Sequence, residues 1–374
     1  MGYETKIEWA THTFNPWRGC TKVSAGCTNC YAERQSHRNP KVLGVWGDGG
    51  TRVVASEGMW REPIRWAKAA RADGERPRVF CASLADWLED RQELVAPLAR
   101  LLDLIHETWP LDWLLLTKRP ENWRKRLESA YSAMPTDKSR RFVGSWIDGG
   151  IPGNVWVGTS VEDQACADER IPHLLKIPAR VRFLSCEPLL VTVKLPEHLS
   201  RIDGPGLISH GDFRDWIHWV IIGGESGPRA RPSRLEWHLS IINQCRAAGV
   251  PVFWKQWGSV VRLGYYHEHD VLRERVLDMR HKIIVPTREG GAYEHDTRID
   301  GQPPLESLIE AYPGFKGGDW SEWPEDLRVR EIPTESNEPA PTCTLCGKPM
   351  SVVRPGKYEC YRERCQVENA KEQR

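Results

Sequence analysis

The chain has 374 residues, of which 40% are hydrophobic and 28% are charged, and its formal net charge is +1 at pH 7. A chain of this length can bury a sizeable core, and so small a net charge gives no global electrostatic case for nucleic-acid binding. No apolar stretch reaches membrane-spanning length, and residues 1–10 are too polar for a signal peptide. We therefore expect a cytoplasmic enzyme without membrane contact, whose 11 cysteines are reduced and available to metals.

Three cysteines near the N-terminus form the most informative motif. Six residues separate Cys20 from Cys27, and two separate Cys27 from Cys30, in a loop that contains Gly and Ser. A structural zinc normally takes four protein ligands, whereas three cysteines on a four-iron cluster leave one iron free for a small molecule. The loop alone leaves two other interpretations open, namely a zinc site completed by His12 or His37, and plain buried cysteines.

Short apolar runs follow, at intervals suited to alternating strands and helices. The predicted strands are 78–83, 113–117, 155–159, 181–185, 219–222 and 251–254. Between the first two, apolar residues at three-and-four spacing predict a helix over 94–105. Buried strands that alternate with helices predict an α/β fold with a parallel sheet, and this number of units favours a partial or complete parallel βα (TIM-like) barrel. The pattern does not distinguish a barrel from a doubly wound sheet.

Polar residues follow the carboxyl ends of these strands, where parallel α/β folds bind their ligands. In chain order they include Ser83, Asp86, Lys118, Arg119, Thr159, Ser160, Glu162, Glu187, Glu225 and Lys255. Any single Ser, Thr or Asp among them could instead cap a helix. Lys118, Glu187, Glu225 and Lys255 are the stronger catalytic candidates, because each directly follows an apolar run. The alternative for Glu225 is an ordinary ion pair with Arg229 or Arg231.

The C-terminal third divides into three further parts after the barrel domain at 1–258. Residues 259–330 form an extension, for which we predict a strand hairpin and a helix packed on the barrel. Residues 331–342 are a Pro- and Glu-rich linker, and residues 343–374 form a separate zinc-ribbon-like module. Its four cysteines, Cys343, Cys346, Cys360 and Cys365, predict a structural zinc site. The module is basic, which suits docking to nucleic acid or to protein.

Five segments of the chain resemble the phage Gp37/Gp68 family, also called the DUF5131 family. They are 15–33, 115–120, 182–190, 222–228 and 255–258, and they match in the same order. That family in turn resembles the radical S-adenosylmethionine enzymes, whose three cysteines hold a 4Fe-4S cluster in a partial βα barrel. The resemblance implies that Cys20, Cys27 and Cys30 are the cluster ligands and that S-adenosylmethionine binds the fourth iron. The spacing departs from most radical enzymes, which have three residues between the first two cysteines.

The same resemblance implies roles for the polar residues at the strand ends. Ser83 and Asp86 stand where typical members bind the amino group of S-adenosylmethionine, and Thr159 and Ser160 can hydrogen-bond its ribose or carboxylate. The catalytic candidates that would bind or act on the substrate are Lys118, Glu187, Glu225 and Lys255.

Two function classes remain open. The first is a radical enzyme that forms a 5′-deoxyadenosyl radical, receives electrons from a reductant protein and acts on nucleic acid or a nucleotide, in base modification or repair. The second is a non-catalytic zinc-binding adaptor of phage origin for nucleic acid or a partner protein, in which the same cysteines are structural. Several tryptophans are candidates for stacking on bases or on an adenine ring, namely Trp17, Trp46, Trp60, Trp254 and Trp257.

Overall fold

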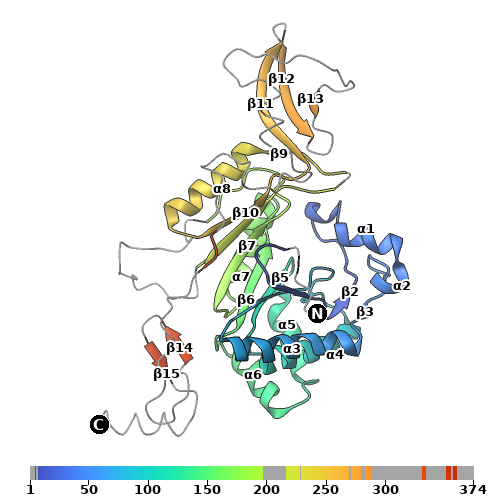
Figure 1. Ribbon diagram of the computed structural model, residues 1–374, viewed down its shortest axis with the longest axis vertical. Helices are drawn as coiled ribbons and strands as arrows, with labels where there is room; N and C mark the ends of the chain where they lie inside the picture. Colours follow the sequence, from blue (N-terminus) through green and yellow to red (C-terminus); the bar gives the residue numbers. More distant parts are fainter. Residues whose placement is uncertain are drawn as a thin grey trace.

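A sheet of seven strands, curled into a half-barrel, forms the centre of the computed structural model (Figure 1). The residues described are 5, 7–196, 216–227, 229–259 and 331–333, with the backbone of the strands at 260–268, 271–278, 283–287, 351–354 and 357–359. In spatial order the strands are β1 (His12–Phe14), β4 (Arg78–Cys81), β5 (Asp112–Thr117), β6 (Val155–Ser160), β7 (Val181–Cys186), β8 (Trp219–Gly223) and β10 (Val252–Gln256).

Every neighbouring pair in this sheet is parallel, and the spatial order follows the chain order. The order confirms the predicted strands and parallel sheet, and it excludes a doubly wound arrangement, in which the order reverses at a switch point. β1 and β10 stand at opposite ends of the order, so the barrel is partial rather than complete. All the carboxyl ends of the strands lie on one edge of the sheet.

Helices follow most of the strands and cover the convex face of the half-barrel. They are α3 (Glu57–Asp73), α4 (Val95–Glu107), α5 (Trp123–Tyr131), α6 (Asp137–Ile147), α7 (Gln164–Leu175) and α8 (Leu235–Ala248). The predicted helix over 94–105 is α4, which buries Leu98, Leu101 and Ile105 on one face. Asp163 caps α7 by accepting a hydrogen bond from the Cys166 N–H at 2.8 Å.

The remaining elements lie outside the central sheet. Short helices are α1 (Tyr31–Arg38) and α2 (Pro40–Leu43), with 3-10 turns η1 (Ala25–Cys27), η2 (Gln92–Leu94) and η3 (Pro120–Asn122). A second sheet has the order β13 (Ile283–Thr287), β12 (Val271–Asp278), β11 (Val260–Glu268), β9 (Ser233–Arg234). Two further pairs are β2 (Trp17–Arg18) with β3 (Val53–Val54), and β14 (Ser351–Arg354) with β15 (Lys357–Glu359).

The antiparallel β11–β12 pair confirms the hairpin predicted for residues 259–330. The helix predicted for that segment lies outside the described residues. So do the four predicted zinc ligands, Cys343, Cys346, Cys360 and Cys365. Across the described part of the chain, none of the helices combines the length and apolar character needed to cross a bilayer.

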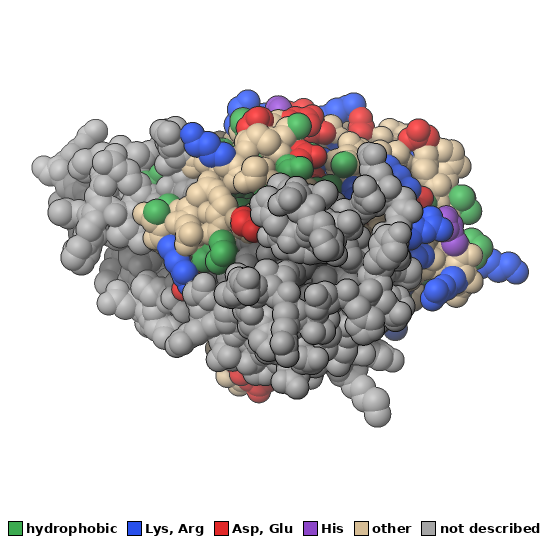
Figure 2. Space-filling view, turned by 90° about the horizontal axis from the view of Figure 1, so that it is seen from above, with side chains coloured by type: hydrophobic (Ala, Val, Ile, Leu, Met, Phe, Trp, Pro, Cys, Tyr) green, Lys and Arg blue, Asp and Glu red, His purple; other side chains and the backbone are tan. Residues whose placement is uncertain are grey.

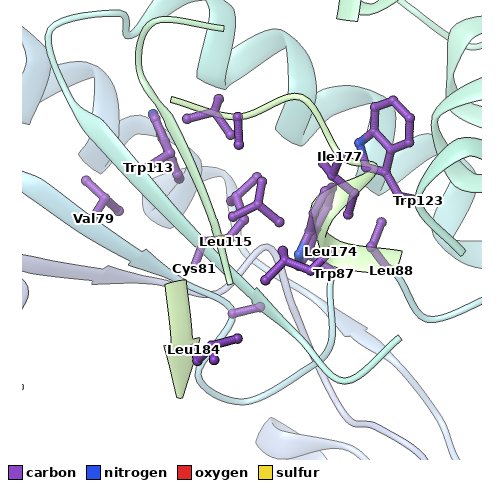
Figure 3. Packing of buried hydrophobic residues seen from close by; sticks show 14 of the residues in the cluster. Val79, Cys81, Trp87, Leu88, Trp113, Leu115, Trp123, Leu174, Ile177 and Leu184 are labelled. Atoms are coloured by element: carbon purple, nitrogen blue, oxygen red, sulfur yellow. The ribbon is translucent and has the colours of Figure 1, made fainter. Parts of the chain in front are cut away.

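Both faces of the central sheet are buried, which explains why its strands read as continuous apolar runs. Along β5, Trp113 and Leu115 belong to the large cluster under the helices, and Leu114 to a second cluster on the concave face. Figure 3 shows part of the first cluster, including Val79 and Trp113. The concave cluster is strongly aromatic and contains Trp9, Phe80, Trp156, Phe183, Trp219 and Phe253.

Two segments far apart in the chain, around Trp9 and around Glu331, meet at this concave cluster. The Trp9 ring packs edge-on against Phe80, with ring centroids 4.6 Å apart. The Trp219 indole N–H donates to the Glu331 carbonyl at 2.9 Å, and the Glu331 N–H donates to the Val252 carbonyl on β10 at 2.7 Å. The first residue of the predicted linker is therefore bound to the outer edge of the half-barrel.

Four of the tryptophans considered for base stacking are core residues. Trp17, Trp60, Trp254 and Trp257 are each at most 2% exposed. The prediction that they stack on a ligand is therefore wrong, because their ring faces already pack against protein. Trp254 and Trp257, for example, are in edge-to-face contact at 4.6 Å.

Candidate functional site

The three N-terminal cysteines lie on the loop that follows β1, at the carboxyl edge of the sheet. We call residues 15–30 the cysteine loop. Cys20, Cys27 and Cys30 are all free, partly exposed thiols. Cys27 ends η1, and Cys30 immediately precedes α1. The loop approaches β6 so closely that a Cβ on Gly26 would lie 2.4 Å from the Glu162 side chain, so a larger residue would displace one of them.

The three thiols supply the donor chemistry of a thiolate-ligated metal group, but their positions do not bring them together into one. Cys27 and Cys30 lie close enough for their charges to interact, whereas Cys20 contacts Arg119. Throughout the described ranges, no three His, Cys, Asp or Glu side chains form a metal-ligating group. His12, considered as a fourth zinc ligand, lies in β1 and stacks on Trp66 with ring centroids 4.2 Å apart.

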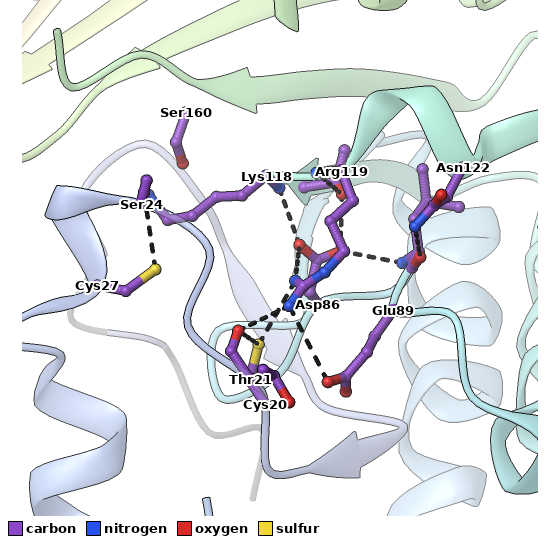
Figure 4. Close-up of polar contacts among 12 residues, drawn as sticks. Cys20, Thr21, Ser24, Cys27, Asp86, Glu89, Lys118, Arg119, Asn122 and Ser160 are labelled. Atoms are coloured by element: carbon purple, nitrogen blue, oxygen red, sulfur yellow. Dashed lines mark hydrogen bonds and ion pairs between the residues drawn. The ribbon is translucent and has the colours of Figure 1, made fainter. Parts of the chain in front are cut away.

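Asp86 and Arg119 form a buried ion pair beneath the cysteine loop (Figure 4). The Arg119 guanidinium donates to Asp86 Oδ2 at 2.8 Å. Asp86 also accepts from the Thr117 hydroxyl at 2.6 Å and from the Lys118 backbone N–H at 2.8 Å. Asp86 is 4% exposed. Both of its carboxylate oxygens therefore already accept hydrogen bonds from the ends of the protein's own strands.

Arg119 also binds the first part of the cysteine loop. It donates to the Thr21 carbonyl at 2.6 Å and lies 3.7 Å from Cys20 Sγ. A neighbouring buried pair adds a second contact, because Arg52 binds Glu89 through two hydrogen bonds of 2.7 and 2.6 Å and donates to the Thr21 hydroxyl at 2.9 Å. Burial, together with the Asp86 carboxylate, raises the pKa of the Cys20 thiol to about 12, although Arg119 opposes the rise.

Glu162, after β6, holds the middle of the loop. It accepts from the Ser24 hydroxyl at 3.0 Å, from Arg170 at 2.7 Å and from the Lys118 ammonium. Burial lowers the pKa of Lys118 to about 8. Burial alone would raise the pKa of Cys27, but the Lys118 cation and hydrogen bonds around Ser24 outweigh it and lower that pKa. The Cys27 thiolate is therefore favoured over that of Cys20 or Cys30, whose pKa burial raises.

Glu225, after β8, holds the last part of the loop. Its carboxylate accepts from Asn29 Nδ2 at 3.0 Å and from the Arg231 backbone and guanidinium at 2.7–2.9 Å. Arg231 in turn donates to the Ala25 carbonyl at 2.9 Å. Burial alone would raise the pKa of Glu225, but the hydrogen bonds from Arg231 outweigh burial, and the net effect is a lowered pKa. Glu225 therefore forms an ion pair with Arg231, as the alternative interpretation of this residue expected.

Glu187 and Lys255 form a separate ion pair at the same edge. Lys255 Nζ lies 2.8 Å from Glu187 Oε1, and the Ser185 hydroxyl donates to Glu187 Oε2 at 3.3 Å. The Lys255 and Glu187 side chains are 32% and 15% exposed, so a ligand can reach both. A Cβ on Gly223 would lie 2.7 Å from Glu187 Oε1, so the glycine leaves room for this carboxylate.

The three hydroxyl residues predicted to bind a cofactor occupy different settings. Ser83 accepts a hydrogen bond from Asn15 Nδ2 at 3.0 Å. The buried Thr159 hydroxyl donates to the Thr117 carbonyl at 2.9 Å, which ties β6 to β5. Ser160 ends β6 and is drawn in Figure 4 at the same edge as Lys118.

Sequence reasoning missed Arg52 and Glu89, whose pair supports the loop, and Arg170, which pairs with Glu162. Arg52 and Glu89 are 37 positions apart and lie outside the predicted strands. The tertiary fold, and not a local sequence pattern, brings this pair to Thr21. Arg119 had a local signal, because it follows Lys118 directly at a strand end.

A family model described as "Protein of unknown function (DUF5131)" matches residues 4–286. Searches of curated proteins and of solved structures found no match.

Proposed function

The chain belongs to the DUF5131 family, and on that premise we propose that it is a radical S-adenosylmethionine iron–sulfur enzyme. The observation that carries the proposal is the place of the cysteine loop. It follows β1 of a parallel half-barrel, and polar residues after β4, β5, β6 and β8 contact it along the carboxyl edge. Ligands of parallel α/β folds bind at this edge.

In this proposal Cys20, Cys27 and Cys30 hold a 4Fe-4S cluster, because three thiolates leave one iron for S-adenosylmethionine. When bound, the two groups supply a 5′-deoxyadenosyl radical, with an electron from a reductant protein. The protein's own part is to hold the cysteine loop at the carboxyl edge and to place cations beside two of its thiols. Arg119 lies against Cys20, and the Lys118 cation lowers the pKa of Cys27. Both cations favour the thiolate form that iron requires.

The contacts divide most of the predicted site residues into three groups. Asp86, Thr159 and Glu225 already hydrogen-bond within the protein, so we assign them to holding the site. We keep Ser160 as a cofactor contact, and also Ser83, which would exchange its hydrogen bond with Asn15 for one to the cofactor. The substrate would meet the partly exposed pair of Glu187 and Lys255, whose opposite charges suit a ligand with both donors and acceptors.

We propose a nucleic acid or a nucleotide as substrate, with zinc in the C-terminal module. The support is the basic sequence of residues 343–374, which on a tether raises the local concentration of the barrel near a polyanion. On the described surface in Figure 2, basic and acidic side chains are interspersed, in keeping with the net charge of +1. We therefore assign nucleic-acid affinity to the module rather than to the half-barrel.

The test is iron and acid-labile sulfide analysis after anaerobic reconstitution. We expect about four irons per chain and a brown chromophore in the wild type, and loss of both in Cys20→Ala, Cys27→Ala and Cys30→Ala. Cys343→Ala is the matched control, because it removes a predicted zinc ligand and should keep the iron. Stoichiometric zinc with no iron in the wild type would contradict the proposal and favour the structural adaptor.

A further inference from the structure

We infer that Arg119 is a positioning residue for Cys20, which it holds and supplies with a hydrogen bond in the cluster-loaded enzyme. The inference rests on the proposed function and concerns how the protein tunes the same site. Cys20 lies beside a guanidinium, with Arg119 Nη1 at 3.7 Å from its sulfur.

Arg119 has one orientation because three acceptors share its two terminal nitrogens. Nη1 binds Asp86 and Cys20, and Nη2 binds the Thr21 carbonyl at 2.6 Å. The side chain is 8% exposed. A buried guanidinium with a carboxylate partner at 2.8 Å neither leaves nor rotates at low cost, because either change would strand a charge. Arg119 therefore sets the position of the loop at residues 20–21.

Asp86 makes this orientation possible. The carboxylate is itself held by the Thr117 hydroxyl and the Lys118 N–H, both at the end of β5. Together these bonds form a continuous connection from a rigid strand end through Asp86 and Arg119 to Cys20. A lysine at position 119 would keep the charge but could not bind all three acceptors in this planar geometry.

Two consequences follow for a cluster bound through Cys20. A hydrogen bond from a cation to a ligating sulfur stabilises the more negative, reduced state, so it raises the reduction potential. Fixing the ligand also slows its loss, and groups that orient metal ligands typically change metal affinity about 10- to 100-fold. Arg119 would then affect both the potential and the retention of the cluster.

The experiment compares wild type, Arg119→Gln, Arg119→Lys and Asp86→Asn after anaerobic reconstitution. Measurements are the iron stoichiometry, the rate of iron loss to a chelator, and the midpoint potential from an EPR-monitored titration. Hydrogen exchange of residues 19–27 in the metal-free proteins gives a further readout. The control is Arg100→Gln, whose partners are Glu57 and the Trp60 ring.

We expect Arg119→Gln to lose iron about 10- to 100-fold faster, to shift the potential to more negative values and to speed exchange in residues 19–27. Arg119→Lys should have a midpoint potential between those of Arg119→Gln and the wild type, while hydrogen exchange in residues 19–27 stays fast. If Arg119→Gln does not fold, the comparison of Arg119→Lys with the wild type tests the inference. If the wild type loads a cluster and both Arg119 variants match its midpoint potential and its rate of iron loss, this inference alone is overturned. A wild type that takes up no cluster would overturn the proposed function and the inference with it.

Discussion

Charged side chains at the carboxyl edge of the sheet mainly bind one another and the cysteine loop. Asp86, Arg119, Glu89 and Arg52 are buried as two opposite-charge pairs with side chains at most 8% exposed. Removing one member of such a pair leaves an uncompensated buried charge and typically costs about 3–5 kcal/mol. Substitutions here therefore report stability as well as function. Asn and Gln also remove the charge, but they keep most of the side-chain volume and some hydrogen bonding, so they disturb the packing less than alanine does.

His238 shows how a buried titratable group links this fold to pH. Its Nδ1 accepts from the Trp254 indole N–H at 2.9 Å, so the proton lies on Nε2, which is 2.7 Å from the Ser233 hydroxyl. The ring is completely buried, and burial lowers its pKa to about 3. The neutral imidazole is thus the form that joins α8 to β9 and β10.

We predict an acid-sensitive contribution from His238 to the free energy of unfolding. The unfolded chain binds the proton near pH 6.5, whereas the folded protein does so only near pH 3. The contribution is therefore complete above about pH 6.5 and is lost as pH falls toward 3, with a slope of up to about 1.4 kcal/mol per pH unit. Urea unfolding between pH 7 and 4 should give a shallower slope for His238→Gln than for the wild type.

The control for this prediction is His37→Gln, at an exposed position on α1, which should leave the slope unchanged. Parallel pH dependences in the wild type and His238→Gln would show that His238 does not titrate across this window.

At the scale of elements, three anchors hold the cysteine loop over the sheet. Arg119 binds residues 20–21, Glu162 binds Ser24, and the Glu225–Arg231 pair binds Ala25 and Asn29. The anchors come from β5, β6 and the segment after β8. Beyond the short strand β2 and η1 the loop has little secondary structure of its own, so its conformation from Cys20 to Cys30 depends on these side-chain bonds.

Replacing Glu225 should release the C-terminal anchor of the loop. In Glu225→Ala, Asn29 and Arg231 lose an acceptor, and a lost hydrogen bond to a charged group is typically worth about 1.5–3 kcal/mol. We expect roughly tenfold or greater acceleration of amide hydrogen exchange at residues 25–30. Glu236→Ala, at an exposed position in the first turn of α8, is the matched control. Unchanged exchange in Glu225→Ala would mean that Asn29 and Ala25 are held by other contacts.

The strands were predictable because their signal is local. Runs such as Trp113–Leu116 are apolar on both faces, and both faces of a helix-covered half-barrel are buried. The roles of the polar residues at the strand ends were harder to predict from the sequence, because they depend on partners far along the chain. Glu225 is a potential catalytic acid in sequence, but Asn29, 196 positions away, shares its carboxylate with Arg231. The buried tryptophans were misjudged for two reasons. Trp254 lies in the predicted strand 251–254, whose apolar run already indicated burial, whereas the burial of Trp17, Trp60 and Trp257 depends on tertiary packing.

At the scale of the whole molecule, the concave face of the half-barrel is contacted by two segments far apart in the chain, one around Trp9 and one around Glu331. Trp9 enters from the N-terminal side, and Glu331 binds β10 and Trp219 from the C-terminal side. A partial barrel leaves an edge strand with unpaired backbone groups, which is a liability unless it is covered. The bonds between Glu331 and Val252 satisfy part of that edge.

Two neighbouring tryptophans on this face should respond differently to the same change. The Trp219 N–H donates to the Glu331 carbonyl at 2.9 Å, whereas the buried Trp156 N–H has no acceptor among the described residues. Their rings are 6.0 Å apart and almost fully buried. Trp219→Phe should therefore lower the free energy of unfolding by about 1–2 kcal/mol more than Trp156→Phe. Equal urea midpoints would show that the Glu331 contact contributes nothing to stability.

The most direct test of the proposed activity is reductive cleavage of S-adenosylmethionine. Reconstituted wild type, S-adenosylmethionine and dithionite would be incubated anaerobically, and 5′-deoxyadenosine measured by mass spectrometry, with Cys30→Ala treated identically. We predict 5′-deoxyadenosine and methionine in equal amounts from the wild type and neither from Cys30→Ala. A fully iron-loaded wild type that forms no more 5′-deoxyadenosine than Cys30→Ala would contradict the account.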